Sequence, residues 1–382
     1  MTASPRVARA SQIPLAQPNI GPREIELVTE VLRSDVLAMG PYTEAFERGI
    51  AELSGRRHAI ACSSGTAGLH MAVRALDIGA GDEVITTPFS FVASSNCVLF
   101  ERAIPRFVDI EEESLGIDPG LVEEAAGERT RALLPVHVYG NPCRVDELAA
   151  IARDHGWALI EDSCEALGGS LNGRMLGSFG EASVFAFYPN KQITTGEGGV
   201  VLTDDDALAE RLRSLRNQGR DADGTWMHHI QLGFNYRMDE MSAALGVAQL
   251  ERLTELHAGR DAVFGFYADA LAARNWVRLP RPAAGAAVDW FVYVVRLDPD
   301  IDRDRLIGQL AERGVPSRPY FSPIHLQPFY AEQFGYGPGS FPVTERVSRS
   351  ALALPFSSRL DESAVREVAA ALDDAVAEQG RA

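Results

Sequence analysis

Four short segments of the sequence carry side chains that could do chemistry, and each follows an apolar run. The most distinctive is Lys191, which leaves the run Ala182-Phe187 through Tyr188-Pro189-Asn190 and enters the glycine-rich turn Gly196-Glu197-Gly198-Gly199. Most lysines are solvated surface residues. At this place a lysine is expected to be partly buried, and burial favours the neutral amine, which can attack a carbonyl group and form a Schiff base.

The segment Ser63-Ser64-Gly65-Thr66 follows the run His58-Cys62 and opens a helix-like stretch. Free backbone N–H groups at a helix start, a glycine that permits close approach and neighbouring hydroxyls together make a cradle for a phosphate. The same residues also fit a plain capped turn between a strand and a helix.

Two further side chains follow strand-like runs. Asp162 comes after Trp157-Glu161, and a carboxylate at the end of a buried strand must be hydrogen-bonded or paired. It could hold a proton on a pyridine nitrogen, although Asp162-Ser163-Cys164-Glu165 fits a helix capping box equally well. Phe91 follows the run that ends at Thr87, where it could stack on a planar ring or belong to the core.

Short apolar runs rich in β-branched residues alternate with helix-like segments, and these elements must position the four candidates. The strand candidates are His58-Cys62, Glu83-Thr87, Arg106-Asp109, Ala132-Val136, Trp157-Glu161, Ala182-Phe187 and Val200-Thr203. The helix candidates between them include Ala67-Leu76, Val145-His155 and Asp205-Leu215. This order predicts an α/β fold with a mostly parallel sheet and helices on both faces.

Ligands of such sheets bind at the carboxyl ends of the strands, so the four candidates are expected to meet at one edge. A phosphate cradle, a stacking aromatic, an acid for a ring nitrogen and an amine are the parts that a pyridoxal 5'-phosphate site requires. No one of these signals decides the matter alone.

A second, smaller domain is predicted after the sheet. A helical pattern without proline runs from Met238 to about Asn275, and the strand Trp290-Leu297 and the helices Arg303-Arg313 and Glu362-Glu378 follow. We therefore expect a large cofactor-binding domain at 1–250 and a small C-terminal α+β domain at 251–382. The stretch Pro280-Ala287 is typical of a surface loop.

Composition narrows the classes of partner. The 382 residues carry 36 Lys and Arg against 53 Asp and Glu, a net charge of −17, which disfavours non-specific binding to nucleic acid or to an anionic membrane. The four cysteines form no Cys-x-x-Cys pair and are expected to be reduced core thiols. The start, Met1 to Pro14, has no apolar run typical of a signal peptide, and no stretch approaches the ~18 apolar residues of a spanning helix, so we expect a cytoplasmic protein.

The sequence resembles the sugar aminotransferases of the DegT–StrS group, within fold-type I of the pyridoxal phosphate enzymes. The resemblance runs from about Ile20-Gly21 to the C-terminal region. Its landmarks are Gly40-Pro41, Phe46-Glu47, Ser64-Gly65-Thr66-Ala67, Pro88-Phe89-Ser90-Phe91-Val92-Ala93, Pro135-Val136-His137-Val138-Tyr139-Gly140, Glu161-Asp162, Phe187-Tyr188-Pro189-Asn190-Lys191, Gly196-Glu197-Gly198-Gly199, Gly233-Phe234-Asn235-Tyr236-Arg237, His325-Leu326-Gln327 and Leu354-Pro355.

The resemblance implies a role for each candidate. Lys191 would carry the cofactor as a Schiff base and move protons, Asp162 would pair with the pyridine nitrogen, and Phe91 would stack on the ring. Gly65 and Thr66 would hold the phosphate. The asparagine that matches Asn235 reaches the phosphate of the neighbouring subunit in this family, which implies a homodimer with shared active sites.

Two positions depart from the commonest pattern of the family. Ala186 stands where a serine often binds the phosphate, five residues before the lysine. Glu165 stands where glutamine or histidine is common, three residues after the aspartate, and we include it among the expected cofactor-binding residues.

The reaction implied by the resemblance has two half-reactions. An amino donor, L-glutamate by resemblance, passes its nitrogen to the cofactor, which then aminates the keto group of a nucleotide-linked deoxysugar. A sugar 3-dehydratase of the same fold is disfavoured because those relatives replace the lysine with histidine. A regulator that only binds a pyridoxal-type ligand stays open. A nicotinamide dehydrogenase is disfavoured because Gly79-Ala80-Gly81 precedes a strand instead of following one.

Overall fold

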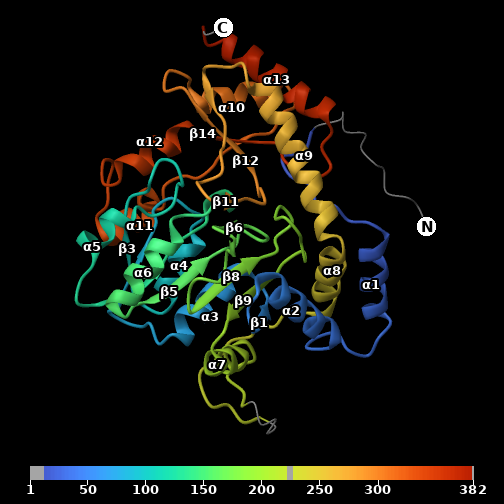
Figure 1. Ribbon diagram of the computed structural model, residues 1–382, viewed down its shortest axis with the longest axis vertical. Helices are drawn as coiled ribbons and strands as arrows, with labels where there is room; N and C mark the ends of the chain where they lie inside the picture. The colour runs from blue at the N-terminus through green and yellow to red at the C-terminus, as the bar shows by residue number, and fades with distance from the viewer. Residues whose placement is uncertain (1–12, 222–226, 381–382) are drawn as a thin grey trace.

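The computed structural model describes residues 13–221 and 227–380, and its centre is a seven-stranded sheet (Figure 1). The strand order is β1-β9-β8-β5-β4-β2-β3, and all pairings are parallel except those of β9, which runs antiparallel to both neighbours. The strands are β1 (His58–Cys62), β2 (Glu83–Thr86), β3 (Ile104–Phe107), β4 (Thr130–Leu134), β5 (Ala158–Asp162), β8 (Ala182–Ala186) and β9 (Gly199–Thr203). The predicted α/β class is confirmed.

Helices cover both faces of this sheet, which explains why its strands are apolar on both sides. One face packs against α3 (Gly65–Ala75), α4 (Ala93–Phe100) and α7 (Asp206–Arg216). The opposite face packs against α2 (Pro41–Ser54), α6 (Val145–His155) and α8 (Glu240–Glu251). Neighbouring residues of one strand divide between the two layers: Ile60 of β1 faces the first, and Ala59 and Ala61 face the second.

The helical run expected from Met238 to Asn275 is two helices. α8 ends at Glu251 and α9 (Leu253–Leu271) begins after Arg252, whose φ of −110° and ψ of 11° interrupt the helical geometry. Neither glycine nor proline marks the break. Instead the Arg252 guanidinium donates to Glu24 of α1 (Pro22–Leu32) at 2.7 Å.

A second sheet follows α9 and forms the small α+β part that the sequence predicted. Its order is β10-β12-β14-β13, all antiparallel, with β10 (Val277–Arg278), β12 (Tyr293–Leu297), β13 (Arg318–Pro319) and β14 (Ala351–Leu354). It shares a core with α9, α10 (Arg303–Glu312) and α13 (Glu362–Ala377), at the top of Figure 1. The division at residue 250 stays a prediction.

The stretch Pro280-Ala287 is more than a surface loop. Its last two residues form β11 (Ala286–Ala287), which pairs with β6 (Ser170–Leu171) and so joins a three-stranded sheet with β7 (Arg174–Met175). The alternation that would signal a strand cannot be seen in two residues. The remaining helices of the described chain include α5 (Val122–Ala125), α11 (Pro328–Phe334) and α12 (Pro342–Ser350).

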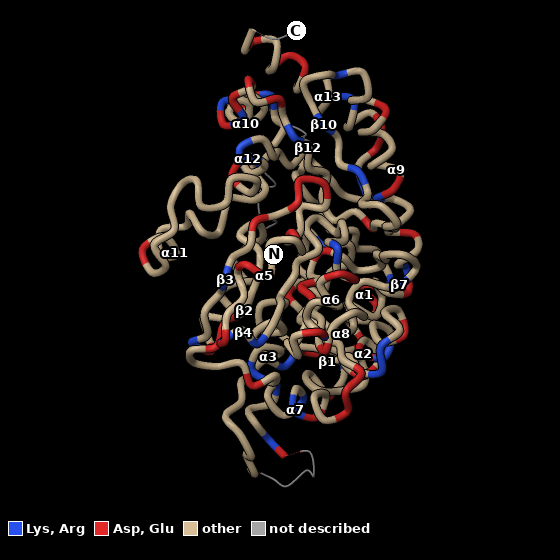
Figure 2. The backbone as a smooth tube through the Cα atoms, turned by 60° about the vertical axis from the view of Figure 1, so that its left-hand side comes forward, with Lys and Arg blue, Asp and Glu red and all other residues tan. Residues whose placement is uncertain are grey.

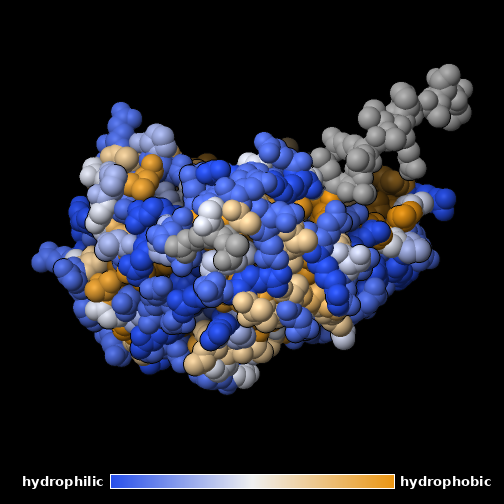
Figure 3. Space-filling model, turned by 90° about the horizontal axis from the view of Figure 1, so that it is seen from above, coloured by the Kyte–Doolittle hydropathy of each residue, from blue (hydrophilic) through white to orange (hydrophobic). Residues whose placement is uncertain are grey.

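Acidic and basic residues are interspersed along the chain (Figure 2). The face above the second sheet is mostly hydrophilic, with small, separated hydrophobic areas (Figure 3). Among the described residues, every helix is too short or too polar to cross a membrane. Residues 1–12, on which most of the signal-peptide prediction rests, lie outside the described chain.

Candidate active site

A cavity of about 490 Å³ lies at the carboxyl edge of the central sheet. It collects side chains from the ends of five strands, β1, β2, β4, β5 and β8, and one residue from the second part of the chain, Tyr320. Of the residues predicted from the sequence, six line it: Gly65, Thr66, Phe91, Asp162, Glu165 and Lys191.

The start of α3 forms one end of the cavity. Ser64 is the N-cap, and its Oγ accepts a hydrogen bond from the Ala67 N–H at 3.1 Å. A Cβ atom at Gly65 would lie 2.6 Å from Cβ of Ala186, so only glycine lets α3 begin this close to the end of β8. Thr66 lines the cavity beside it. The capped turn and the cradle expected from the sequence are thus compatible, because the cap uses the Ser64 side chain and leaves the helix start facing the cavity.

Asp162 ends β5 and is only 5% exposed. Its Oδ2 accepts from Oγ of Ser94 at 2.6 Å, and its Oδ1 accepts from the Cys164 N–H at 3.1 Å. No helix follows, so the helix-cap interpretation is wrong, and Oδ1 holds a turn instead. Among the described residues no Lys, Arg or His side chain lies within 4.0 Å of this carboxylate, which leaves it suited to a cationic ligand atom.

Lys191 projects into the same cavity from the turn after β8. Its backbone N–H donates to Tyr188 O at 2.9 Å, and its side chain is 12% exposed. The Nζ atom lies 3.6 Å from Oε1 of Glu165 and 4.0 Å from the centre of the Phe291 ring. The predicted partial burial of the lysine is therefore present in the structure.

Glu165 is buried between Lys191 and the turn at Tyr139. Its Oε2 accepts from the Tyr139 N–H at 2.8 Å. Burial raises the pKa of the Glu165 carboxyl, and the nearby charge of Lys191 opposes that rise in part. Burial thus favours the protonated form of this carboxyl, and the charge of Lys191 favours the ionised form.

Phe91 stands at the mouth of the cavity and is 61% exposed. A core role for this ring is thus wrong, whereas its neighbour Phe89 is fully buried. An exposed ring at a cavity mouth is available to stack on a planar ligand.

Asn235 does not line the cavity. It is exposed in an arm whose two halves are joined by the bridges Asn217–Asn235 and Arg220–His229. This arm follows α7 and extends away from the body of the chain (Figures 1 and 2). Asn235 lies at the base of the arm, since the oxygen of its neighbour Tyr236 accepts from the Ser63 N–H at 2.8 Å, and its expected contact with a neighbouring subunit stays a prediction.

Sequence reasoning missed several residues of the site. Ser94 follows Phe91 by three residues, and the turn that starts α4 aims its hydroxyl at Asp162. Tyr320 and Phe291 arrive from the second part of the chain, at least 100 residues after Lys191. Only the seryl hydroxyl one helical turn after Phe91 could have been suspected from the pattern.

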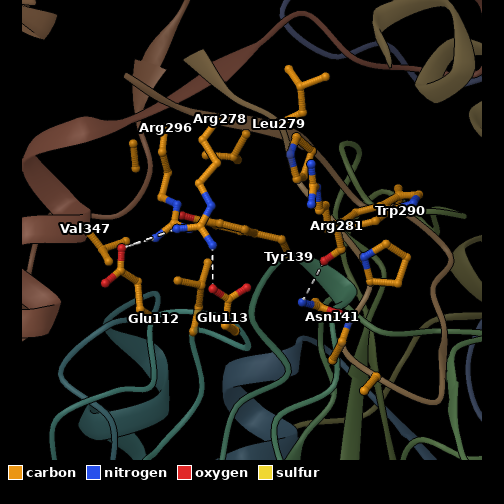
Figure 4. A pocket seen from close by; sticks show the side chains of 17 residues that line it. Glu112, Glu113, Tyr139, Asn141, Arg278, Leu279, Arg281, Trp290, Arg296 and Val347 are labelled. Atoms are coloured by element: carbon orange, nitrogen blue, oxygen red, sulfur yellow. Dashed lines mark hydrogen bonds and ion pairs between the residues drawn. The ribbon is translucent and has the colours of Figure 1, made fainter. Parts of the chain in front are cut away.

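A second cavity, of about 260 Å³, lies on the other side of Tyr139 and shares no lining residue with the first (Figure 4). Arginine side chains gather there, but Arg278 is ion-paired with Glu112 and Glu113, and Arg296 is 3.1 Å from Glu112. These pairs neutralise much of the local charge.

Comparison with known proteins gives consistent results. The model of the DegT/DnrJ/EryC1/StrS aminotransferase family matches residues 18–373. GDP-perosamine synthase of Caulobacter vibrioides is 38% identical, over 95% of this chain and 98% of that protein. The solved structure of DesV of S. venezuelae, in complex with a ketimine intermediate, is 36% identical with a TM-score of 0.86, over 92% of this chain and 93% of the other.

Helicobacter pylori PseC, an aminotransferase involved in the biosynthesis of pseudoaminic acid, superimposes with a TM-score of 0.92 at 26% identity, over 96% of this chain and 100% of the other. The similarity is thus spread over both sheets and is not confined to the cofactor edge. The chain belongs to the DegT/DnrJ/EryC1/StrS aminotransferase family and is a pyridoxal-phosphate-dependent enzyme.

Proposed function

We propose that this aminotransferase moves an amino group from L-glutamate to the keto group of a nucleotide-linked deoxysugar. Amino transfer to a sugar is supported by the family and by relatives named for amino-sugar synthesis. The nucleotide link and the glutamate donor rest on the resemblance alone, and the experiment below addresses both.

The observation that supports the proposal is that one cavity holds both a buried carboxylate and a partly buried amine. A buried carboxylate without a cationic partner among the described residues, Asp162, shares the cavity with a partly buried amine, Lys191. Pyridoxal phosphate has a basic ring nitrogen and an aldehyde at opposite parts of one ring, and these need an acid partner and an amine. The donor set therefore fits the cofactor.

The side chains divide the work by position. Lys191 would attach the cofactor and afterwards carry a proton between the two carbon atoms that exchange it. Asp162, fixed by Ser94 and Cys164, would keep a proton on the ring nitrogen, and Phe91 would cover the ring. When bound, the cofactor supplies an electron sink for the carbanion that deprotonation leaves.

The phosphate would lie at the start of α3, against Gly65 and Thr66. Two glycines keep this corner open: a Cβ atom at Gly65 would meet Ala186, and one at Gly199 would lie 2.4 Å from Ser64 O. Backbone N–H groups at a helix start attract a dianion without any basic side chain.

Glu165 would lie beside the Lys191 amine, to which the cofactor is attached. Its Oε1 lies near the Lys191 Nζ, and its raised pKa means that it loses its proton reluctantly unless the lysine is charged. We infer that Glu165 holds the free ammonium group in place between the two half-reactions.

The assembly we propose is a homodimer in which Asn235 of each arm completes the phosphate site of the other subunit. The arm carries exposed apolar side chains, Met227, Ile230 and Leu232, which a partner surface would cover. A cytoplasmic location also stays a prediction, to be tested by fractionation of the cells that express the protein.

The test begins with the visible absorption of the purified protein. Addition of L-glutamate should bleach the band of the bound cofactor, and a nucleotide-linked keto-deoxysugar should restore it with formation of an amino sugar, identified by its mass. A protein that binds the cofactor but responds to no amino donor would instead be a regulator. Restoration by free keto sugars as readily as by nucleotide-linked ones would contradict the nucleotide requirement.

A further inference from the structure

A single arginine joins the catalytic turn to the second part of the chain. Arg260 lies in α9 and is only 4% exposed. Its Nη2 donates to the backbone oxygen of Lys191 at 2.6 Å, and its Nη1 donates to the backbone oxygens of Phe291 at 3.1 Å and, more weakly, of Trp290 at 3.5 Å. Both residues on which the amine depends are therefore held by one guanidinium.

The charge of this guanidinium is poorly compensated. Among the described residues no carboxylate lies within 4.0 Å of it, and its Nε has no hydrogen-bond partner. Asp289 attracts it from beyond 4.0 Å, and the Asp289 carboxylate is itself paired with His257. Desolvation lowers the pKa of Arg260 to about 10.

A buried cation held by carbonyl groups and by the face of one ring, Phe356 at 5.6 Å, is an expensive way to stabilise a fold, because desolvation of the charge opposes folding. An apolar side chain of similar length would fill the same space without that cost. The burial of Arg260 is thus better explained by the backbone oxygens that its planar guanidinium fixes in place than by a contribution to stability.

The backbone oxygens of Lys191 and Phe291 that Arg260 holds together define where the Lys191 Nζ lies. The Lys191 backbone is fixed from one side by its N–H bond to Tyr188 and from the other by Arg260. The Phe291 ring, 4.0 Å from Nζ, is attached to the second carbonyl that Arg260 holds. Loss of the guanidinium frees the base of the lysine side chain and the ring against its tip.

We propose that Arg260 is a positioning residue that holds the Lys191 amine in its reactive place through the backbone oxygens of Lys191 and Phe291. The proposal rests on Lys191 as the attachment point of the cofactor, but on no particular amino donor or sugar. Because Arg260 belongs to α9, which shares a core with the second sheet, the reactivity of Lys191 also depends on the position of that sheet.

The experiment measures capture of pyridoxal phosphate by the apoprotein, which needs neither substrate. Arg260→Met removes the hydrogen bonds to Lys191, Phe291 and Trp290 and keeps an apolar chain of similar length. The control, Arg274→Met, removes an arginine just after α9 whose ion pair is with Asp373, away from the cavity. Capture is followed by the visible band and by borohydride trapping on the peptide that contains Lys191.

Arg260→Met should slow capture roughly tenfold, because a misplaced nucleophile loses orientation. It should slow the glutamate half-reaction at saturation by a similar factor, with half-saturation within about twofold of wild type. Arg274→Met should match wild type in both, even if it unfolds at a lower temperature. Arg260→Lys keeps the charge but not the fork, and it should recover part of the capture rate.

Equal capture rates for Arg260→Met and wild type would overturn the proposal, and so would a loss shared by Arg274→Met. If Arg260→Met does not fold, Arg260→Lys carries the test, and wild-type capture by that variant would overturn it in the same way. Wild-type trapping at Lys191 without turnover of any keto sugar would refute the proposed function and leave this inference intact.

Discussion

The substitution Asp162→Asn removes the negative charge of the carboxylate and keeps nearly the same side-chain shape. The asparagine carbonyl can keep the hydrogen bond from the Cys164 N–H, and its amide can face Ser94, whose hydroxyl also has Ser90 Oγ at 2.8 Å. The apoprotein should therefore lose at most about 1 kcal/mol, one neutral hydrogen bond, and removal of a buried charge offsets even that.

Cofactor binding should respond differently. The ring nitrogen loses a charge-assisted hydrogen bond worth about 1.5–3 kcal/mol, which corresponds to a dissociation constant about 10- to 150-fold higher. The glutamate half-reaction should slow by at least as much, because a neutral ring nitrogen accepts electrons poorly.

The assay pairs thermal unfolding of the apoprotein with titration of pyridoxal phosphate. The control is Asp109→Asn: Asp109 is also buried, but it accepts from the N–H groups of Val343 and Thr344 and does not line the cavity. It should unfold at a lower temperature and bind the cofactor normally. If Asp162→Asn bound the cofactor as tightly as wild type, the assignment of Asp162 to the ring nitrogen would be refuted.

Four further outcomes are expected. Lys191→Ala should abolish turnover and leave the far-ultraviolet circular dichroism unchanged, and borohydride should trap the cofactor of wild type on the Lys191 peptide and on no other. Ala186→Ser should tighten cofactor binding by about 1 kcal/mol if its hydroxyl reaches the phosphate, and unchanged affinity would show that another group fills that role. Co-expressed Lys191→Ala and Asn235→Ala chains should recover roughly a quarter of wild-type activity, because about half of the dimers are mixed and each mixed dimer has one intact site of two. Activity no greater than the sum of the activities of the two single mutants would exclude a shared site. Burial raises the folded-state pKa of Glu165, so its protonated form stabilises the fold fully below the unfolded pKa, and this contribution is lost as the pH rises through the folded pKa. Apo wild type should therefore lose stability relative to Glu165→Gln from about pH 4.5 upward. Parallel pH profiles of the two unfolding temperatures would contradict this.

Much of the sheet was predictable because burial on both faces leaves continuous apolar runs. The limits of β1 and α6 agree with the expected His58–Cys62 and Val145–His155. β3 starts two residues earlier than expected, at Ile104, because Pro105 hides the start of the strand. β3 is at the edge of the sheet, where a strand tolerates proline.

The candidate site was predictable as far as it depends on strand ends. The missing residues depend on contacts between distant segments: Tyr320, Phe291 and Arg260 reach the cavity or the Lys191 turn only after the second sheet has packed on the first. The break at Arg252 has the same origin, since its partner Glu24 lies 228 residues away. Periodicity within a window carries no information on such contacts.

The antiparallel strand β9 has a consequence for the motion of the site. The chain leaves the sheet at Ala186 and re-enters it at Gly199, and these two residues are paired, so the intervening loop is closed by the ladder between β8 and β9. Inside it, Phe187 N–H donates to Gly198 O, and Thr195 N–H donates to Phe187 O, both at 3.0 Å. The amides of Phe187 and Thr195 should therefore exchange with solvent hydrogen only when this end of the central sheet opens. Any widening of the cavity should therefore come from its other walls, such as the mouth at Phe91, while the ends of the loop that carries Lys191 stay fixed to the central sheet.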